Sequence, residues 1–88
     1  MDKLEELANA KEQKFLMEHG AHEWTKHDLI QEASEEIVDA FSYIRAHEKL
    51  KFGDENAVFA CTVIRKQLKS VFESIELLRE IENGSKGT

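Results

Sequence analysis

The sequence predicts an all-α protein: a three-helix antiparallel unit that is completed by oligomerisation into a helical bundle. The chain of 88 residues has no proline and only four glycines, so residues that interrupt helices are rare. Apolar residues recur at spacings of three and four in three long segments, which is the period of an amphipathic helix. A chain of this length fills one core, so residues 1–83 are expected to form a single helical domain, followed by a disordered tail at 84–88.

The first helix is expected from Asp2 to Glu18, with the Asp2 side chain as its N-cap. Its apolar residues at helical spacing are Leu4, Leu7, Ala8 and Phe15. The helix is expected to end near Gly20, because glycine readily adopts the left-handed conformation that closes many helices.

The second helix is expected from Lys26 to Lys51, with Thr25 as its N-cap. Its predicted core row consists of Ile30, Ala33, Ile37, Phe41 and Ile44. Trp24 precedes this helix and is interpreted as a hydrophobic staple or lid over the helix junction. Stacking on a nucleobase is the alternative role for this side chain.

The third helix is expected from Glu55 to Glu82, after a break at Gly53 and an N-cap at Asp54. Its main apolar stripe consists of Ala57, Cys61, Ile64, Leu68, Val71, Phe72, Ile75 and Leu78, and a second apolar group on the opposite side consists of Phe59, Val63, Leu77 and Ile81. A helix that is apolar on two sides needs two partners. In a chain this short the second partner is expected to be another subunit, which predicts a homodimer or higher oligomer.

The charge balance bears on partners and location. The formal net charge is −6, from 18 acidic and 12 basic residues, so the surface repels a phosphate backbone and no direct nucleic-acid partner is expected. Cys61 is the single cysteine, which excludes an internal disulfide, and no apolar run approaches the roughly 20 residues that span a bilayer. The N-terminus lacks a signal-peptide profile. These features predict a soluble, cytoplasmic protein.

Four carboxylates gather on the second predicted helix. Glu32, Glu36 and Asp39 follow the spacing i, i+4, i+7 and share one face, with Glu35 beside them and Tyr43 one turn beyond. Neighbouring like charges destabilise a helix and favour a counter-ion, and Mg²⁺ prefers carboxylate oxygens. The alternative is an ordinary solvated face, because the row lies opposite the core row of the same helix. The histidines have no spacing that predicts a zinc site.

The stretch from His27 to Ile44 resembles the metal-binding helix of MazG-like proteins, the all-α nucleoside triphosphate pyrophosphohydrolase superfamily, and especially its short, often phage-encoded members. Residues 36–39 match the Glu-x-x-Asp element of that family, and residues 32–35 match its Glu-x-x-Glu element. In the family the two elements lie on separate helices, whereas here they are contiguous. A second Glu-x-x-Glu candidate, at residues 73–76, lies on the third predicted helix.

The resemblance implies a Mg²⁺-dependent enzyme that converts a nucleoside triphosphate to the monophosphate and pyrophosphate. The implied metal ligands are Glu32, Glu36 and Asp39, and Glu32 or Glu35 would orient or deprotonate the attacking water. Lys66, Lys69 and neighbouring Arg65 are candidate phosphate contacts, and Tyr43 a candidate hydrogen-bond partner of the ligand. An ordinary solvated surface is the alternative interpretation of these basic side chains.

Two other functions fit the same residues. One is a non-catalytic nucleotide-binding or protein-interaction module on the same scaffold, for example a phage-encoded sequestering or inhibitory protein. The other is a structural helical oligomer, in which the acidic residues only keep the surface soluble. Loss of part of a metal-ligand set abolishes turnover before it abolishes binding. The contiguous arrangement of the two motif elements therefore also fits a module that binds a nucleotide without hydrolysing it.

Overall fold

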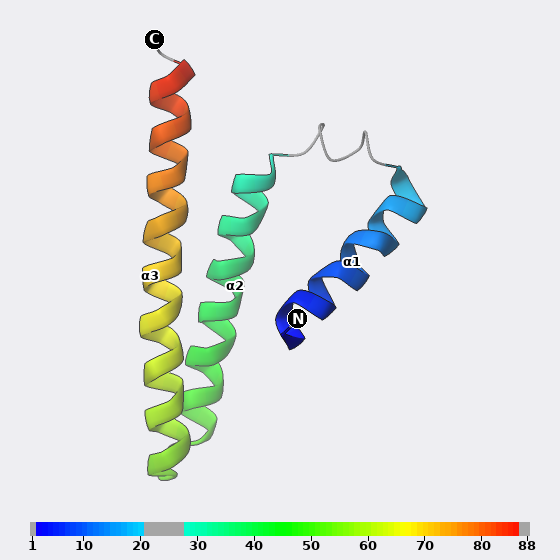
Figure 1. Ribbon diagram of the computed structural model, residues 1–88. Coiled ribbons are helices and arrows are strands. Elements are labelled where there is room, and N and C mark those ends of the chain that lie inside the picture. Colours follow the sequence, from blue (N-terminus) through cyan, green and yellow to red (C-terminus); the bar gives the residue numbers. More distant parts are fainter. Residues whose placement is uncertain (1, 21–27, 87–88) are drawn as a thin grey trace.

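The computed structural model describes residues 2–20 and 28–86 of the chain. They form three α-helices: α1 (Lys3–His19), α2 (Leu29–Leu50) and α3 (Glu55–Lys86). No strand occurs among these residues. Figure 1 shows α2 and α3 running side by side in opposite directions, with α1 beyond α2 on the side away from α3. The all-α prediction is therefore confirmed.

Both predicted caps of α1 are present. The Oδ1 atom of Asp2 accepts a hydrogen bond of 2.8 Å from the backbone N–H of Glu5. At the other end, Gly20 has a φ of 82° and its N–H donates to the carbonyl oxygen of Leu16 at 2.9 Å. Helix ends leave backbone groups without partners inside the helix. The first bond satisfies an N–H of the first turn, and the second satisfies a carbonyl oxygen of the last turn.

The start of α2 differs from the prediction. The helix begins at Leu29 rather than Lys26, because Asp28 has extended backbone angles and acts as the N-cap. Its Oδ1 atom accepts a hydrogen bond of 3.0 Å from the N–H of Gln31. Aspartate ranks above threonine as an N-cap, which gives the physical reason for the later start. The predictions for Trp24 and Thr25 concern positions outside the described residues.

A short turn joins α2 to α3. Gly53 has a φ of 98°, a conformation that L side chains rarely adopt. Asp54 then caps α3, with its Oδ1 atom accepting from the N–H of Ala57 at 3.1 Å. The helix continues to Lys86, beyond its predicted end at Glu82. Residues 84–86 are therefore helical where a disordered tail was expected, and residues 87–88 lie outside the described part.

The contact between α2 and α3 follows a seven-residue repeat on each helix. Cys61 of α3 and Ser34 of α2 are the buried residues of the described chain, at 5% and 7% exposure. The residues Ile30, Ile37, Phe41 and Ile44 of α2 and Ala57, Leu68, Phe72 and Ile75 of α3 are half-buried. The prediction of Ala33 as a core residue is wrong, because Ser34 takes the place between Ile30 and Ile37 in an alternating spacing of four and three.

Two arginines of α3 bind side chains of α2 at separate points along the hairpin. Close to the turn, Arg65 donates from Nε and Nη2 to both carboxylate oxygens of Glu48, at 3.1–3.2 Å. Towards the start of α2, Nη2 of Arg79 donates to Oε1 of Gln31 at 2.9 Å. Arg65, which the sequence left open as a phosphate contact, is thus engaged in an ion pair within the hairpin.

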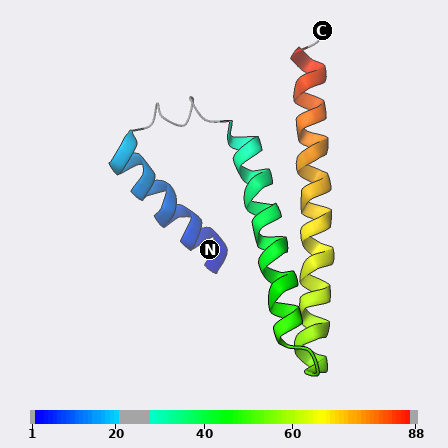
Figure 2. The ribbon, with the colours of Figure 1, turned by 180° about the vertical axis from the view of Figure 1, so that it is seen from behind.

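Much of the predicted apolar surface has no cover. Ile64, Val71 and Leu78, predicted as part of the main stripe of α3, remain 37%, 44% and 45% exposed. The second apolar group of α3 is also exposed, and so are Leu4, Leu7, Leu16 and Met17 of α1. A single neighbouring helix covers only part of a helix circumference, and α1 stands apart from α3 in both views (Figures 1 and 2). The hairpin therefore forms a seam but not an enclosed core.

The dimensions of the molecule agree with this open arrangement. The Cα radius of gyration is 16.7 Å, whereas a compact domain of this length has about 12 Å. The accessible surface is 7392 Å², whereas a compact monomer of 10.2 kDa exposes roughly 5,300 Å². No described helix combines the length and the apolar character needed to cross a membrane.

Candidate functional site

The acidic row of α2 lies on the outer side of the hairpin. Glu32, Glu36, Asp39 and Tyr43 are all exposed, and Ile37 and Ile44 on the opposite side of the helix contribute to the seam with α3. This placement follows from the 3.6-residue period, which brings positions i, i+4 and i+7 to one face. The outer row therefore combines carboxylates with a tyrosine, as the spacing predicted.

Glu35 has a different environment from that row. It lines a hollow of about 460 Å³ between α2 and α3 together with Asp39 of α2 and with Glu76 and Arg79 of α3. We call this the acidic hollow. Its remaining lining residues are Gln31, Ser34, Val38 and Phe72. Among the predicted metal ligands, Asp39 therefore belongs to the outer row and also lines the groove between the helices.

A chain of hydrogen bonds positions Glu35. The Oε1 atom of Glu35 accepts from Nε2 of Gln31 at 3.1 Å, and Oε1 of Gln31 in turn accepts from Arg79 at 2.9 Å. The arginine therefore polarises the amide that holds the carboxylate, without neutralising the carboxylate directly. Glu35 keeps acceptor capacity on the side of the hollow.

The structure brings the second Glu-x-x-Glu candidate close to the carboxylates of α2. Glu76 is half-buried in the acidic hollow, and Glu73 lines the neighbouring hollow. The sequence placed Ile75 in the apolar stripe, and Glu76 lies one position further around the helix. Because Ile75 belongs to the apolar stripe, the sequence predicts that its neighbour Glu76 lies at the edge of that stripe, next to the groove.

The donor atoms suit Mg²⁺ in kind but do not enclose it. Within residues 2–20 and 28–86, no three His, Cys, Asp or Glu side chains are close enough to hold a metal ion together. Neighbouring carboxylate pairs are available at Glu36–Asp39 and at Glu35–Asp39. Mg²⁺ in phosphate-processing sites is commonly bound by one or two carboxylates, with water and substrate phosphates completing the octahedron. The pairs on α2 fit a site of that type.

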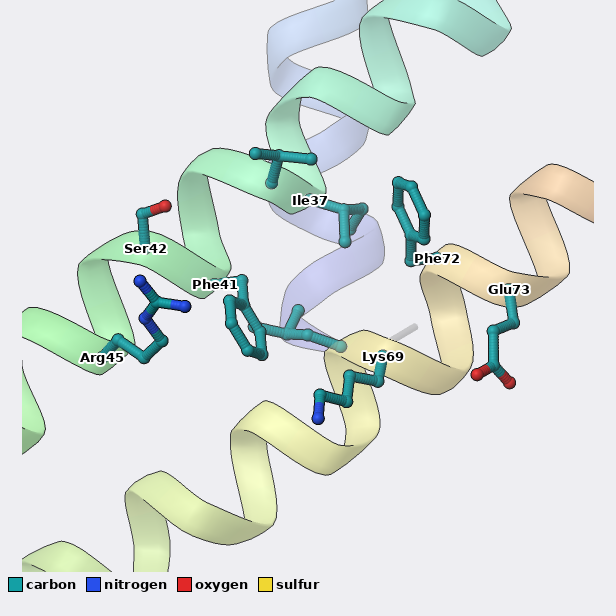
Figure 3. Close-up of a pocket in the computed structure, with 9 residues that line it drawn as sticks. Ile37, Phe41, Ser42, Arg45, Lys69, Phe72 and Glu73 are labelled. Atoms are coloured by element: carbon teal, nitrogen blue, oxygen red, sulfur yellow. The ribbon is translucent and has the colours of Figure 1, made fainter.

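A second hollow adjoins the acidic one and has a different character (Figure 3). Its volume is about 370 Å³, and its lining consists of Ile37, Val38, Phe41, Ser42, Arg45, Leu68, Lys69, Phe72 and Glu73. The guanidinium carbon of Arg45 lies 5.5 Å from the centroid of the Phe41 ring, and Nζ of Lys69 lies 6.0 Å from it. We call this the cationic hollow.

The cationic hollow contains one of the three predicted ligand contacts. Lys69 lines it, whereas Lys66 is exposed on α3 outside its lining and Tyr43 belongs to the outer row of α2. The structure therefore does not bring these three residues together in one chain. Arg45 was not predicted as a site residue. Its position four residues after Phe41, on one helix face, is the sequence signal for their contact.

The two hollows are neighbours along the groove between α2 and α3, because Val38 of α2 and Phe72 of α3 line both. The acidic hollow has three carboxylates and Arg79, and the cationic hollow has two cations and Glu73. Glu32 borders a different hollow, between α1 and α2, that is also lined by Lys11, Glu12 and Phe15.

Comparisons of the chain with protein-family profiles, curated proteins and solved structures give no match. The fold and the groove define an all-α protein in which a helical hairpin presents acidic and basic side chains side by side. The resemblance of residues 27–44 to MazG-like proteins stays an expectation that rests on its own motifs.

Proposed function

We propose that the chain is a MazG-like, Mg²⁺-dependent nucleoside triphosphate pyrophosphohydrolase that produces a monophosphate and pyrophosphate. The observation that carries the proposal is the pair of neighbouring hollows. Acidic residues of two helices, Glu35 and Asp39 of α2 and Glu76 of α3, line the first, and Arg45 and Lys69 line the second. A polyphosphate with a divalent cation needs both kinds of side chain, carboxylates for the cation and basic groups for phosphate oxygens.

Each side chain has a distinct part in this proposal. Glu36 and Asp39 are the first candidates for holding the cation, with Glu32 one helical turn before Glu36 on the same face. When bound, Mg²⁺ would act as a Lewis acid on phosphate oxygens and offset their charge. Glu35 accepts a hydrogen bond from Gln31 and borders the groove, where it would orient a water for attack. Lys69 would bind phosphate oxygens.

The proposal includes assembly of two or more copies into a helical bundle. The chain exposes roughly 2,000 Å² more surface than a compact monomer of its mass, whereas a standard interface buries about 800 Å² per partner. The uncovered residues Ile64, Val71 and Leu78 recur every seven residues along α3, as the contact face of a bundle helix does. A second copy on that face supplies the apolar partner that α2 alone does not.

The proposed activity is tested by incubating the purified chain with a panel of ribo- and deoxyribonucleoside triphosphates and Mg²⁺. We expect release of pyrophosphate, and a loss of about a hundredfold or more in Glu36→Gln and in Asp39→Asn, because each substitution removes one charged oxygen ligand. Both side chains are exposed, so circular dichroism is expected to stay unchanged. Pyrophosphate release no greater than that of Glu36→Gln would refute catalysis.

A non-catalytic nucleotide-binding or protein-interaction module is the second candidate function. It is favoured by the absence, within the described residues, of three carboxylates that could enclose a metal. Calorimetry with each nucleotide, with and without Mg²⁺, separates the candidates. Binding without turnover supports a sequestering role, and no nucleotide binding in either condition leaves a protein partner for the acidic outer row.

A further inference from the structure

We propose that the cationic hollow binds a small amphipathic anion: a molecule with a flat apolar body of one or two rings and a single phosphate or carboxylate group. This inference goes beyond the pyrophosphohydrolase, because it requires neither Mg²⁺ nor turnover. It concerns Arg45, Lys69 and the apolar residues between them, and does not involve the exposed carboxylate row.

The first argument is the state of the two cations. Arg65 pairs with Glu48 and Arg79 with Gln31, whereas Arg45 and Lys69 have no hydrogen bond or ion pair among the described residues. They come from different helices and both lie within about 6 Å of the Phe41 ring. Figure 3 shows the Phe41 ring between the two charged groups, so the cations flank the apolar lining from two sides and an anion in the hollow is attracted by both.

The carboxylate in the same lining leaves these cations available. Glu73 lies on α3 beyond Phe72 in Figure 3, one helical turn after Lys69 and at the end of the hollow away from Arg45. No described ion pair joins it to either of them. A bound anion would consequently direct its charged group towards Arg45 and Lys69 and its apolar body towards Phe72.

The second argument is the floor of the hollow. Apart from the two cations and Glu73, the lining is mostly apolar and consists of Ile37, Val38, Phe41, Leu68 and Phe72. Ser42 adds one hydroxyl group. Small-molecule sites combine such a floor with a few polar groups that fix orientation, and they start at about 300 Å³. The volume of about 370 Å³ suits a ligand of one or two rings.

The third argument is that assembly leaves the hollow open. The exposed residues of α3 on which a second copy is proposed to pack, Ile64, Val71 and Leu78, are not part of its lining. The hollow opens on the side of the hairpin where Val38 and Arg45 of α2 are exposed. A small ligand can therefore reach Arg45 and Lys69 in the monomer and in the proposed bundle.

The test is an NMR titration of the full ¹⁵N-labelled chain with 2-naphthyl phosphate, in the absence of Mg²⁺. We expect saturable shifts of the amides of Ser42, Arg45, Lys69 and their neighbours. The double variant Arg45→Gln/Lys69→Gln is expected to weaken binding about tenfold or more, because the positive charges on both sides of the Phe41 ring are lost. The uncharged 2-naphthol and inorganic phosphate alone are each expected to bind more weakly than the complete probe.

The control variant Lys49→Gln/Lys51→Gln removes the same two charges from exposed residues outside the hollow, and is expected to bind as the unmodified chain does. Equal weakening in both double variants would attribute binding to net charge and overturn the proposal. Absence of shifts around Lys69, or shifts confined to the exposed apolar face of α3, would overturn it as well. The probe has no pyrophosphate bond, so its binding is independent of whether the chain hydrolyses triphosphates.

Discussion

Glu35 and Glu36 are adjacent in the sequence but occupy different environments. Glu35 borders the acidic hollow and accepts a hydrogen bond from Gln31, whereas Glu36 lies on the exposed outer face of α2. One residue corresponds to a rotation of about 100° around a helix, which is enough to move a carboxylate from the groove to the outer surface. The two carboxylates therefore face different surroundings, Glu35 the acidic hollow and Glu36 the solvent.

The Glu48–Arg65 pair allows a prediction for a single substitution. Both side chains are about three-quarters buried, at 23% and 25% exposure, and the arginine contacts both carboxylate oxygens. Glu48→Gln is expected to lower the free energy of unfolding by about 1 kcal/mol, between the values for exposed and for buried ion pairs. Urea denaturation followed by circular dichroism measures this change.

Glu80→Gln is the matched control, since Glu80 is exposed on the same hairpin. We expect its effect to stay within about 0.5 kcal/mol, as for most surface substitutions. Equal destabilisation by both variants would show that the Glu48–Arg65 contact adds nothing to stability. In that case the register of the hairpin would depend on apolar packing alone.

At the scale of elements, the turn between α2 and α3 sets the direction of the hairpin. Gly53 adopts a positive φ and Asp54 caps the helix that follows, so the turn and the start of α3 are encoded in two consecutive residues. The N–H of Asp54 also donates to the carbonyl oxygen of Lys51 at 2.9 Å, which closes the turn. The antiparallel arrangement then follows from the short connection.

Gly53→Ala is expected to destabilise the hairpin by about 1–2 kcal/mol, because an L residue resists the left-handed conformation. No other atom lies within 4 Å of the added Cβ, so the cost arises from the backbone rather than from a clash. Gly84→Ala, at a helical position of α3 that is equally open, is expected to stabilise by up to about 1 kcal/mol. Thermal unfolding of both variants tests the opposite signs. Destabilisation by the two variants alike would contradict this account of Gly53.

At the scale of the whole molecule, the exposed apolar surface is the dominant feature. Phe59, Leu77 and Ile81 on one side of α3, and Val71 near the seam, are exposed at sites where a single chain offers no cover. Large exposed apolar side chains in such number are typical of proteins that associate. The stability of the chain is therefore expected to depend on its concentration.

Val71→Glu is expected to shift the chain from oligomer to monomer and to lower its melting temperature, because a charge would be buried at the contact between copies. Sedimentation equilibrium across a hundredfold range of concentration measures the change. Phe52→Glu is the control: Phe52 lies in the turn and is more exposed than Val71, so it is expected to leave the association unchanged. A monomeric unmodified chain, or one whose association Val71→Glu does not alter, would refute the proposed assembly.

The helices and most of their ends follow from local sequence signals alone. Asp2, Gly20, Gly53 and Asp54 are caps or turn residues whose effect is local, since each acts through hydrogen bonds or backbone angles within a few positions. The start of α2 was misplaced because two N-cap residues, Thr25 and Asp28, compete within one turn of chain. The outer position of the acidic row followed from helical periodicity alone.

Which side chains face one another depends on how α2 and α3 pack. The contact of Lys69 with Phe41, and the placement of Glu76 in one hollow with Glu35 and Asp39, depend on the register between α2 and α3. Periodicity gives the face of each helix but not its offset along the neighbouring helix, which packing of the whole seam determines. The groove of carboxylates and cations is therefore a property of the hairpin, although the residues that form it are visible in the sequence.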